Sequence, residues 1–180
     1  MNVPPEIARA VVVSDSGDAI LVRWTGMPPL VGMLANSRLV HGTISRRFRQ
    51  ATKAGAHREA DRCLRYAAIH RAEAFAFAAG LRQRLAEIYS LPVGQGFVEK
   101  TLRITHQECS RWTKDGRLKS SGSQNIGRSE QTRVKRPTYA AGMIERLVEA
   151  PEAIERWRQA DRRIPHASEP ATHVKSSGAT

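Results

Sequence analysis

Residues 97–118, FVEKTLRITHQECSRWTKDGRL, predict a short helix, a tight turn and a second helix that ends at a glycine. Thr105 stands at the expected start of the second helix, and Glu108 follows three residues later. This is the spacing of a capping box, in which the hydroxyl and the carboxylate each accept a backbone N–H of the first turn. Gly116 suits the left-handed residue that commonly ends a helix.

The second helix of this stretch is amphipathic. Cys109 and Trp112 are three residues apart and share one face, which we expect to be buried. The opposite face carries amides, hydroxyls and cations: His106, Gln107, Ser110, Arg111 and Lys114. A helix of this kind suits the DNA major groove, where side chains meet base edges. The alternative interpretation is an ordinary capped helix of a helical domain, with Trp112 in the core.

Eight residues of the stretch form a recognisable pattern: Leu102, Ile104, Thr105, Cys109, Trp112, Gly116, Arg117 and Leu118. With them, residues 95–160 resemble the helix-turn-helix of the excisionase/MerR-like family, which has the run L-x-I-[ST]-x-x-x-[VC]-x-x-W-x-x-x-G-R-L. The resemblance implies DNA binding, a β-hairpin wing after Leu118 and then a further helix. Residues 139–148, YAAGMIERLV, are the candidate for that helix.

Two features depart from the family pattern. Pro92, Gly94 and Gly96 interrupt the place of the first helix of the motif. Residues 119–136 have no strand-like alternation and few apolar side chains, so we predict a flexible basic loop there. Such a loop can follow a nucleic-acid backbone, or it can be an ordinary linker.

The net charge of +12 is concentrated in the middle of the chain. Residues 41–136 contain twenty basic and eight acidic residues, whereas the flanking segments are balanced. A basic surface of this kind attracts polyanions by counterion release, and nucleic acid is the commonest such partner. The alternative is an arginine-rich soluble protein from a GC-rich genome.

The first half of the chain predicts a hairpin followed by helices. Two β-branched runs, 10–13 and 19–24, flank five turn-forming residues and predict a β-hairpin. Residues 43–54 predict a basic amphipathic helix. Residues 57–89 repeat apolar or small side chains at spacings of four and three, which predicts one long helix with a heptad seam. The seam serves either as a homodimer contact or as the core of a single domain.

Motifs of enzymes and metal centres are absent from the sequence. Gly94 and Gly96 lack the further glycine or lysine of a phosphate-binding loop. His106 and Cys109 supply only two potential metal ligands on one helix. No apolar run approaches the ~20 residues of a membrane span. We therefore expect a cytoplasmic protein that is not an enzyme, has no cofactor or metal and does not bind a membrane.

Together these patterns predict a mainly α fold with an N-terminal β-hairpin, a long heptad-patterned helix and a C-terminal helix-turn-helix-like unit. The predicted parts are residues 1–55 with the hairpin and short helices, the long helix 56–90, the DNA-binding unit 91–163 with its basic loop 119–136, and a disordered tail 164–180.

The function that we predict is sequence-specific binding of double-stranded DNA by a small bacterial or mobile-element transcriptional regulator, dimeric through the 57–89 helix. The residues expected at base edges or nearby phosphates are Gln107, Ser110, Arg111 and Lys114. Those expected on the DNA backbone are Arg117, Lys119, Arg128, Arg133, Lys135 and Arg136. Two alternatives are an interaction or inhibitor protein that uses the long helix and the basic surface, and an RNA-binding protein.

Overall fold

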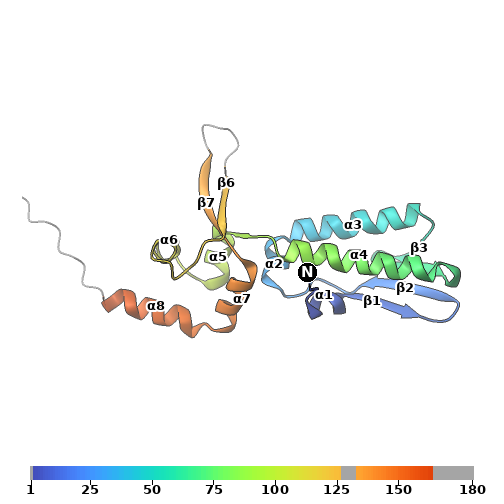
Figure 1. Cartoon of the computed structure of the whole chain (residues 1–180), viewed down its shortest axis with the longest axis horizontal. Helices are drawn as coiled ribbons and strands as arrows, with labels where there is room; N and C mark the ends of the chain where they lie inside the picture. Colours follow the sequence, from blue (N-terminus) through green and yellow to red (C-terminus); the bar gives the residue numbers. More distant parts are fainter. Residues whose placement is uncertain (1, 127–132, 164–180) are drawn as a thin grey trace, which may run out of the picture.

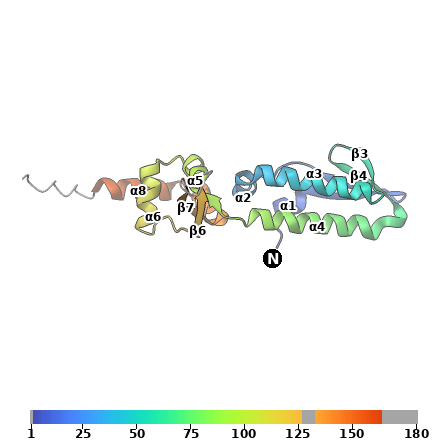
Figure 2. The same cartoon turned by 90° about the horizontal axis from the view of Figure 1, so that it is seen from above.

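A computed structural model describes residues 2–126 and 133–163 of the chain. The protein is elongated, and two units lie end to end along its longest axis (Figures 1 and 2). Each unit has its own cluster of buried apolar side chains. The short helix α2 (Val31–Ala35) lies between them and contacts both α4 and α7, which belong to different units.

The first unit is an antiparallel sheet covered on one face by two helices (Figures 1 and 2). Hydrogen-bonded neighbours in the sheet follow the order β1-β2-β4-β3. A hairpin followed by a helix occurs twice, and the two hairpins meet along β2 and β4 in the middle of the sheet. Besides α2, its elements are α1 (Pro5–Ala10), β1 (Val11–Asp15), β2 (Ala19–Trp24), α3 (Ser37–Lys53), β3 (His57–Ala60), β4 (Cys63–Ala67), the 3-10 turn η1 (Ala68–His70) and α4 (Arg71–Tyr89).

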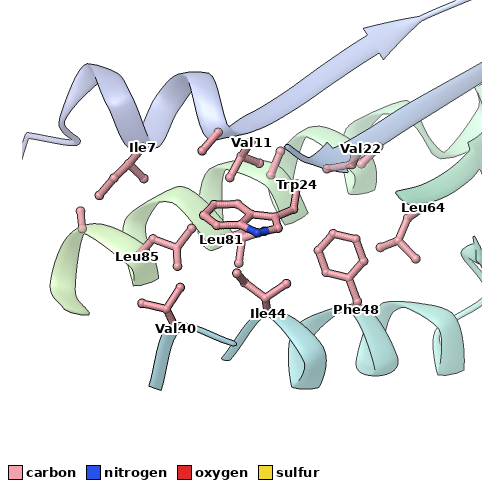
Figure 3. Close-up of a cluster of buried hydrophobic side chains, with 14 of the residues drawn as sticks. Ile7, Val11, Val22, Trp24, Val40, Ile44, Phe48, Leu64, Leu81 and Leu85 are labelled. Atoms are coloured by element: carbon pink, nitrogen blue, oxygen red, sulfur yellow. The ribbon is translucent and has the colours of Figure 1, made fainter. Parts of the chain in front are cut away.

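The core of the first unit is centred on Trp24, which lies between the sheet and the two helices (Figure 3). The side chains of one face of the sheet alternate inward, so Val22 and Leu64 point to the same interior. Ile44 of α3 and Leu81 of α4 pack toward the indole from the helical layer (Figure 3). Burial of these large side chains fixes both helices on the sheet.

The described residues of the second unit form four helices and a three-stranded antiparallel sheet in the order β5-β7-β6. The long strands β6 and β7 form a hairpin that projects away from the unit beside α6 (Figures 1 and 2). Its elements are β5 (Val93–Gly94), α5 (Gln95–Leu102), α6 (His106–Lys114), β6 (Gly122–Ile126), β7 (Val134–Tyr139), α7 (Ala141–Glu149) and α8 (Glu152–Arg163).

The predicted mainly α fold with a single hairpin is wrong, because the described residues form two antiparallel sheets of four and three strands as well as the helices. The predicted N-terminal hairpin is present as β1 and β2, and it is paired with a second hairpin. Strand β3 is exposed along its whole length and β6 likewise, so neither shows the alternation that marks a half-buried strand.

The single helix predicted over 57–89 is also wrong. Residues 57–67 form β3 and β4, and the helix begins only at Arg71. In β4, buried Leu64 and Tyr66 flank exposed Arg65, an alternation that the alanine-rich heptad spacing concealed. The later seam positions, among them Ala74, Leu81 and Leu85, are buried within the chain's own core. The seam is therefore occupied inside one chain, and the predicted ranges 1–55 and 56–90 share one core.

Within the flexible loop predicted over 119–136, residues 122–126 form β6 and residues 134–136 belong to β7. The candidate helix over 139–148 is present as α7, but it begins at Ala141 because Tyr139 still belongs to strand β7. Residues 152–163 form the last described helix, α8. The predicted disordered tail, residues 164–180, lies outside the described residues.

The two units are joined by contacts around Glu145 of α7. One carboxylate oxygen accepts the backbone N–H of Val31 at the start of α2 (2.8 Å), and the other accepts the hydroxyl of Tyr89 at the end of α4 (2.5 Å). Burial and the bond to Glu145 raise the pKa of Tyr89 to about 12, so the phenol keeps its proton and donates. Gly32 lies so close to α4 that a Cβ on it would be 2.1 Å from the carbonyl oxygen of Tyr89.

Candidate nucleic-acid interface

Helix α6 begins and ends where the sequence predicts. The Thr105 hydroxyl accepts the backbone N–H of Glu108 (3.1 Å), and the Glu108 carboxylate accepts the backbone N–H of Thr105 (2.7 Å). After the helix, Gly116 adopts φ +84°, which is the left-handed region that favours glycine. The turn between α5 and α6 passes through Arg103 at φ +53°.

The inner face of α6 is anchored by buried side chains. Cys109 and Trp112 are fully buried, as is Tyr139 at the end of β7. The hydroxyl of Thr113 donates to the carbonyl oxygen of Cys109 (2.7 Å) and therefore accepts the hydroxyl of Tyr139 (2.8 Å). Burial raises the pKa of the Cys109 thiol, which stays protonated. These bonds fix the rotation of α6 relative to the β6–β7 hairpin.

The outer face of α6 gathers all four residues that the sequence assigns to base edges. They line a shallow depression of the surface together with Asp115: Gln107, Ser110, Arg111 and Lys114. Gln107, Arg111 and Lys114 are exposed, and Ser110 is half-buried. Amide, hydroxyl and guanidinium groups thus share one helical surface, and they can donate to and accept from base edges.

Arg111 is not a free cation, because it is paired with Asp161 of α8. The carboxylate of Asp161 is only 8% exposed and lies 2.7 Å from the Arg111 guanidinium. The same carboxylate accepts the indole N–H of Trp112 (2.8 Å) and pairs with Arg117 (2.6 Å). Burial alone would raise the pKa of Asp161, but the bonds from Trp112 and Arg117 outweigh it and the pKa is lowered. Asp161 is therefore charged at neutral pH and holds Arg111 against α8.

Arg117, which the sequence assigns to the DNA backbone, is held inside the unit. Its side chain is 24% exposed, pairs with Asp115 and Asp161, and donates to the carbonyl oxygen of Trp157 (3.2 Å). The guanidinium also lies 5.6 Å from the centre of the Trp112 ring, within cation–π range. In this structure Arg117 stabilises the packing of α8 on α6.

A second ion pair attaches the start of α6 to α8. Arg158 donates to Glu108 (2.9 Å) and to the carbonyl oxygen of Arg103 (2.9 Å) in the turn before α6. The rings of Trp112 and Trp157 meet edge to face, 5.1 Å apart. Sequence reasoning missed Asp161 and Arg158 as partners of α6. Asp161 and Arg158 are about fifty residues away from their partners on α6, so no short-range spacing in the sequence indicates the contacts.

The β6–β7 hairpin presents cations on both of its faces. Lys135 and Arg136 are consecutive in β7, so their side chains point to opposite faces, across from Asn125 and Gln124. Lys119, before the hairpin, and Arg133, at its far end, are also exposed. Neither Lys114, Lys119, Lys135 nor Arg136 forms an ion pair with any described residue. Arg128 lies outside the described residues.

The arrangement around His106 does not resemble a metal centre. Nδ1 of His106 lies 2.8 Å from Glu99 and 3.2 Å from the amide of Gln95, while the neighbouring thiol of Cys109 is turned into the core. Within residues 2–126 and 133–163, no three His, Cys, Asp or Glu side chains are grouped to hold a metal ion.

Comparisons with protein-family models, with curated proteins and with solved structures found no match to the chain. Among the helices that the structure describes, none combines the length and apolar character needed to cross a membrane.

Proposed function

We propose that the protein binds double-stranded DNA in a sequence-specific manner through the second unit. The observation that carries this proposal is the pairing of α6, which has a capped start and an exposed polar face, with the adjacent basic β6–β7 hairpin. In the proposed complex α6 enters the major groove, and the hairpin follows the neighbouring backbone. The order helix, turn, helix and hairpin is the one that resemblance to the excisionase/MerR-like family implies.

Chemistry supports different roles for the two elements. Gln107 and Arg111 can each form paired hydrogen bonds with purine edges in the major groove, which gives sequence preference. Lys135 and Arg136 supply charge to phosphates, which gives affinity without sequence preference. A protein with this division loses affinity as salt rises, in proportion to the phosphates that it contacts.

The first experiment is selection of bound duplexes from a randomised DNA pool at ~50 mM and ~200 mM salt. We expect an enriched motif that persists at the higher salt. Arg111→Ala should then relax the preference at one position of the motif and cost about 1–3 kcal/mol on the selected site. Lys135→Ala should weaken binding to all duplexes alike.

Arg47 offers a matched control for Arg111. Both arginines are exposed on helices, but Arg47 is on α3 in the first unit. Arg47→Ala should leave the preferred motif unchanged. Base reading by α6 would be contradicted if no motif is enriched at either salt concentration. It would also be contradicted if the Arg111 and Lys135 variants lose equal affinity for all duplexes, whatever their sequence.

As the wider biological role, we propose a small cytoplasmic regulator of transcription that is not an enzyme. A homodimer remains part of this proposal, since paired copies read paired half-sites. Because the α4 seam is buried within the chain, dimerisation requires a different surface.

The alternative of an acidic protein partner is favoured by α3. This helix carries five cations, no acidic residue and no ion pair to described residues: Arg38, Arg46, Arg47, Arg49 and Lys53. If the first unit binds an acidic protein, simultaneous Arg46→Glu and Arg47→Glu changes should abolish that binding and leave the selected DNA motif intact.

A further inference from the structure

A cavity of about 710 Å³ lies in the first unit, away from the DNA-binding surface proposed above. It is formed where the end of α3, the starts of β3 and α4 and the end of β4 meet, at the end of the unit far from α6 (Figure 1). Sites for small organic ligands commonly have volumes of about 300–1,000 Å³. The cavity is therefore of suitable size for a compact ligand.

The walls of the cavity are largely apolar. Small side chains leave the space open: Ala51, Ala54, Ala56 and Ala67. Phe77 of α4 and Tyr66 of β4 add two aromatic rings, whose centres are 6.4 Å apart. The Phe77 ring is fixed by an edge-to-face contact with Phe48, 5.6 Å away. Aromatic rings and methyl groups in such an arrangement favour a flat apolar guest.

Tyr66 supplies an unused hydrogen-bonding group. Its side chain lines the cavity and the residue is 8% exposed, yet its hydroxyl bonds to no residue that the structure describes. Burial raises the pKa of Tyr66, so the phenol keeps its proton and can donate. Because the hydroxyl has no partner among the described residues, a ligand in the cavity that carries an acceptor can take its hydrogen bond in place of water.

Two pairs of polar side chains lie at the rim of the cavity. Arg65 lies 3.5 Å from Asp18, and His70 lies 3.4 Å from Glu73. Both pairs are largely exposed, so water screens their charges. The rim therefore gives no preference for a charged ligand.

We propose that this cavity binds a small, flat, uncharged aromatic molecule whose hydrogen-bond acceptor takes the hydroxyl proton of Tyr66. The aromatic part lies between Phe77 and the alanine side chains. This site is separate from the proposed DNA interface, so a result on ligand binding does not depend on whether the protein binds DNA.

The test uses the full chain with ¹³C-labelled alanine methyl groups and coumarin, a neutral bicyclic probe with a carbonyl acceptor. We expect saturable shifts of the Ala51, Ala54, Ala56 and Ala67 methyl signals. Ala51→Phe places a phenyl ring in the space between Phe77 and the alanine side chains, where the guest is proposed to lie, and should abolish the shifts. Tyr66→Phe removes only the hydroxyl and should weaken coumarin binding about fivefold to tenfold.

Ala79→Phe is the matched control for Ala51→Phe, because Ala79 is an exposed alanine of α4 that does not line the cavity. It should leave coumarin binding unchanged. Absence of shifts at the cavity alanines, or shifts that survive Ala51→Phe in a folded variant, would overturn the site. Unchanged affinity in Tyr66→Phe would overturn the hydrogen bond. Tighter binding of coumarin-3-carboxylate than of coumarin would overturn the assignment to an uncharged ligand.

Discussion

The carboxylate of Asp161 has three partners on or next to α6. It accepts the indole N–H of Trp112 and pairs with both Arg111 and Arg117. It thereby determines where the most prominent candidate for base reading, Arg111, is held in the absence of DNA. In a complex, the Arg111 guanidinium must either bridge Asp161 and a base or leave Asp161.

The Asp161→Asn variant tests how much the charge of this carboxylate contributes to the stability of the fold. An amide keeps the size of the side chain but loses the charge that two arginines share, and it leaves both without their buried partner. We expect the free energy of unfolding to fall by about 1–3 kcal/mol, measured by urea unfolding. Asp61→Asn is the control, because the Asp61 side chain, which pairs with Arg58, is 84% exposed; the change should alter the free energy of unfolding by less than about 0.5 kcal/mol. Equal effects would contradict the role of Asp161.

The pH dependence of stability follows from the same ion pairs. The pKa values of Glu108, Asp115 and Asp161 are all lowered from ordinary values of 4.5, 3.8 and 3.8. A lowered carboxyl pKa stabilises the folded state above the ordinary value, and this contribution is lost as pH falls through the folded-state value. The urea midpoint should therefore be steady near neutral pH and fall below about pH 4.5. Trp fluorescence can follow it, and the fall should be shallower in Asp161→Asn.

Among the elements, α6 was predictable because its signals are local. A capping box, a terminal glycine and a buried pair three residues apart all lie within twelve residues of one another. The β6–β7 hairpin was not predictable from its own residues, because every residue of β6 is exposed and no pattern of burial exists. The long helix was mispredicted for a related reason: alanine fits both a helical seam and a strand, so 57–67 carried no decisive signal.

Thr105→Ala should weaken α6 directly. The change removes the hydroxyl that accepts the N–H of Glu108, and it loosens the reciprocal bond of the capping box. Loss of such a cap costs about 1 kcal/mol, and Thr105→Ser should retain most of it. Urea unfolding of the two variants gives the comparison. Similar losses from the serine and alanine variants would show that the hydroxyl is not the stabilising group.

The whole molecule depends on the junction at α2. Gly32→Ala introduces a Cβ where the carbonyl of Tyr89 leaves no room, so the α2–α4 contact must shift. We expect a loss of about 1–3 kcal/mol in the free energy of unfolding, typical of overpacking. Gly42→Ala is the matched control: it lies within α3 with no atom within 4 Å of an added Cβ. It should stabilise by about 0.5–1 kcal/mol. A loss in both variants would contradict the steric argument.

The sequence predicts which polar side chains α6 exposes, but it does not predict the α8 residues that hold α6 in place. The outward side chains of α6 follow from helical spacing, and they lie together as expected. Arg117 was assigned to the DNA backbone because its partner Asp161 is 44 residues away and has no sequence signal. Residues before and after position 55 share one core, because β2 pairs with β4. This pairing joins residues forty or more positions apart, so no local pattern in the sequence indicates it.

The contribution of Val31 to the core of the second unit has a practical consequence for protein engineering. Val31 precedes that unit by about sixty residues and is 6% exposed. A fragment cut at Pro92 would lose this side chain and the backbone N–H that Glu145 accepts. A chimera that transplants the second unit therefore has to supply a substitute for α2, because a direct fusion at Pro92 leaves the core of that unit open.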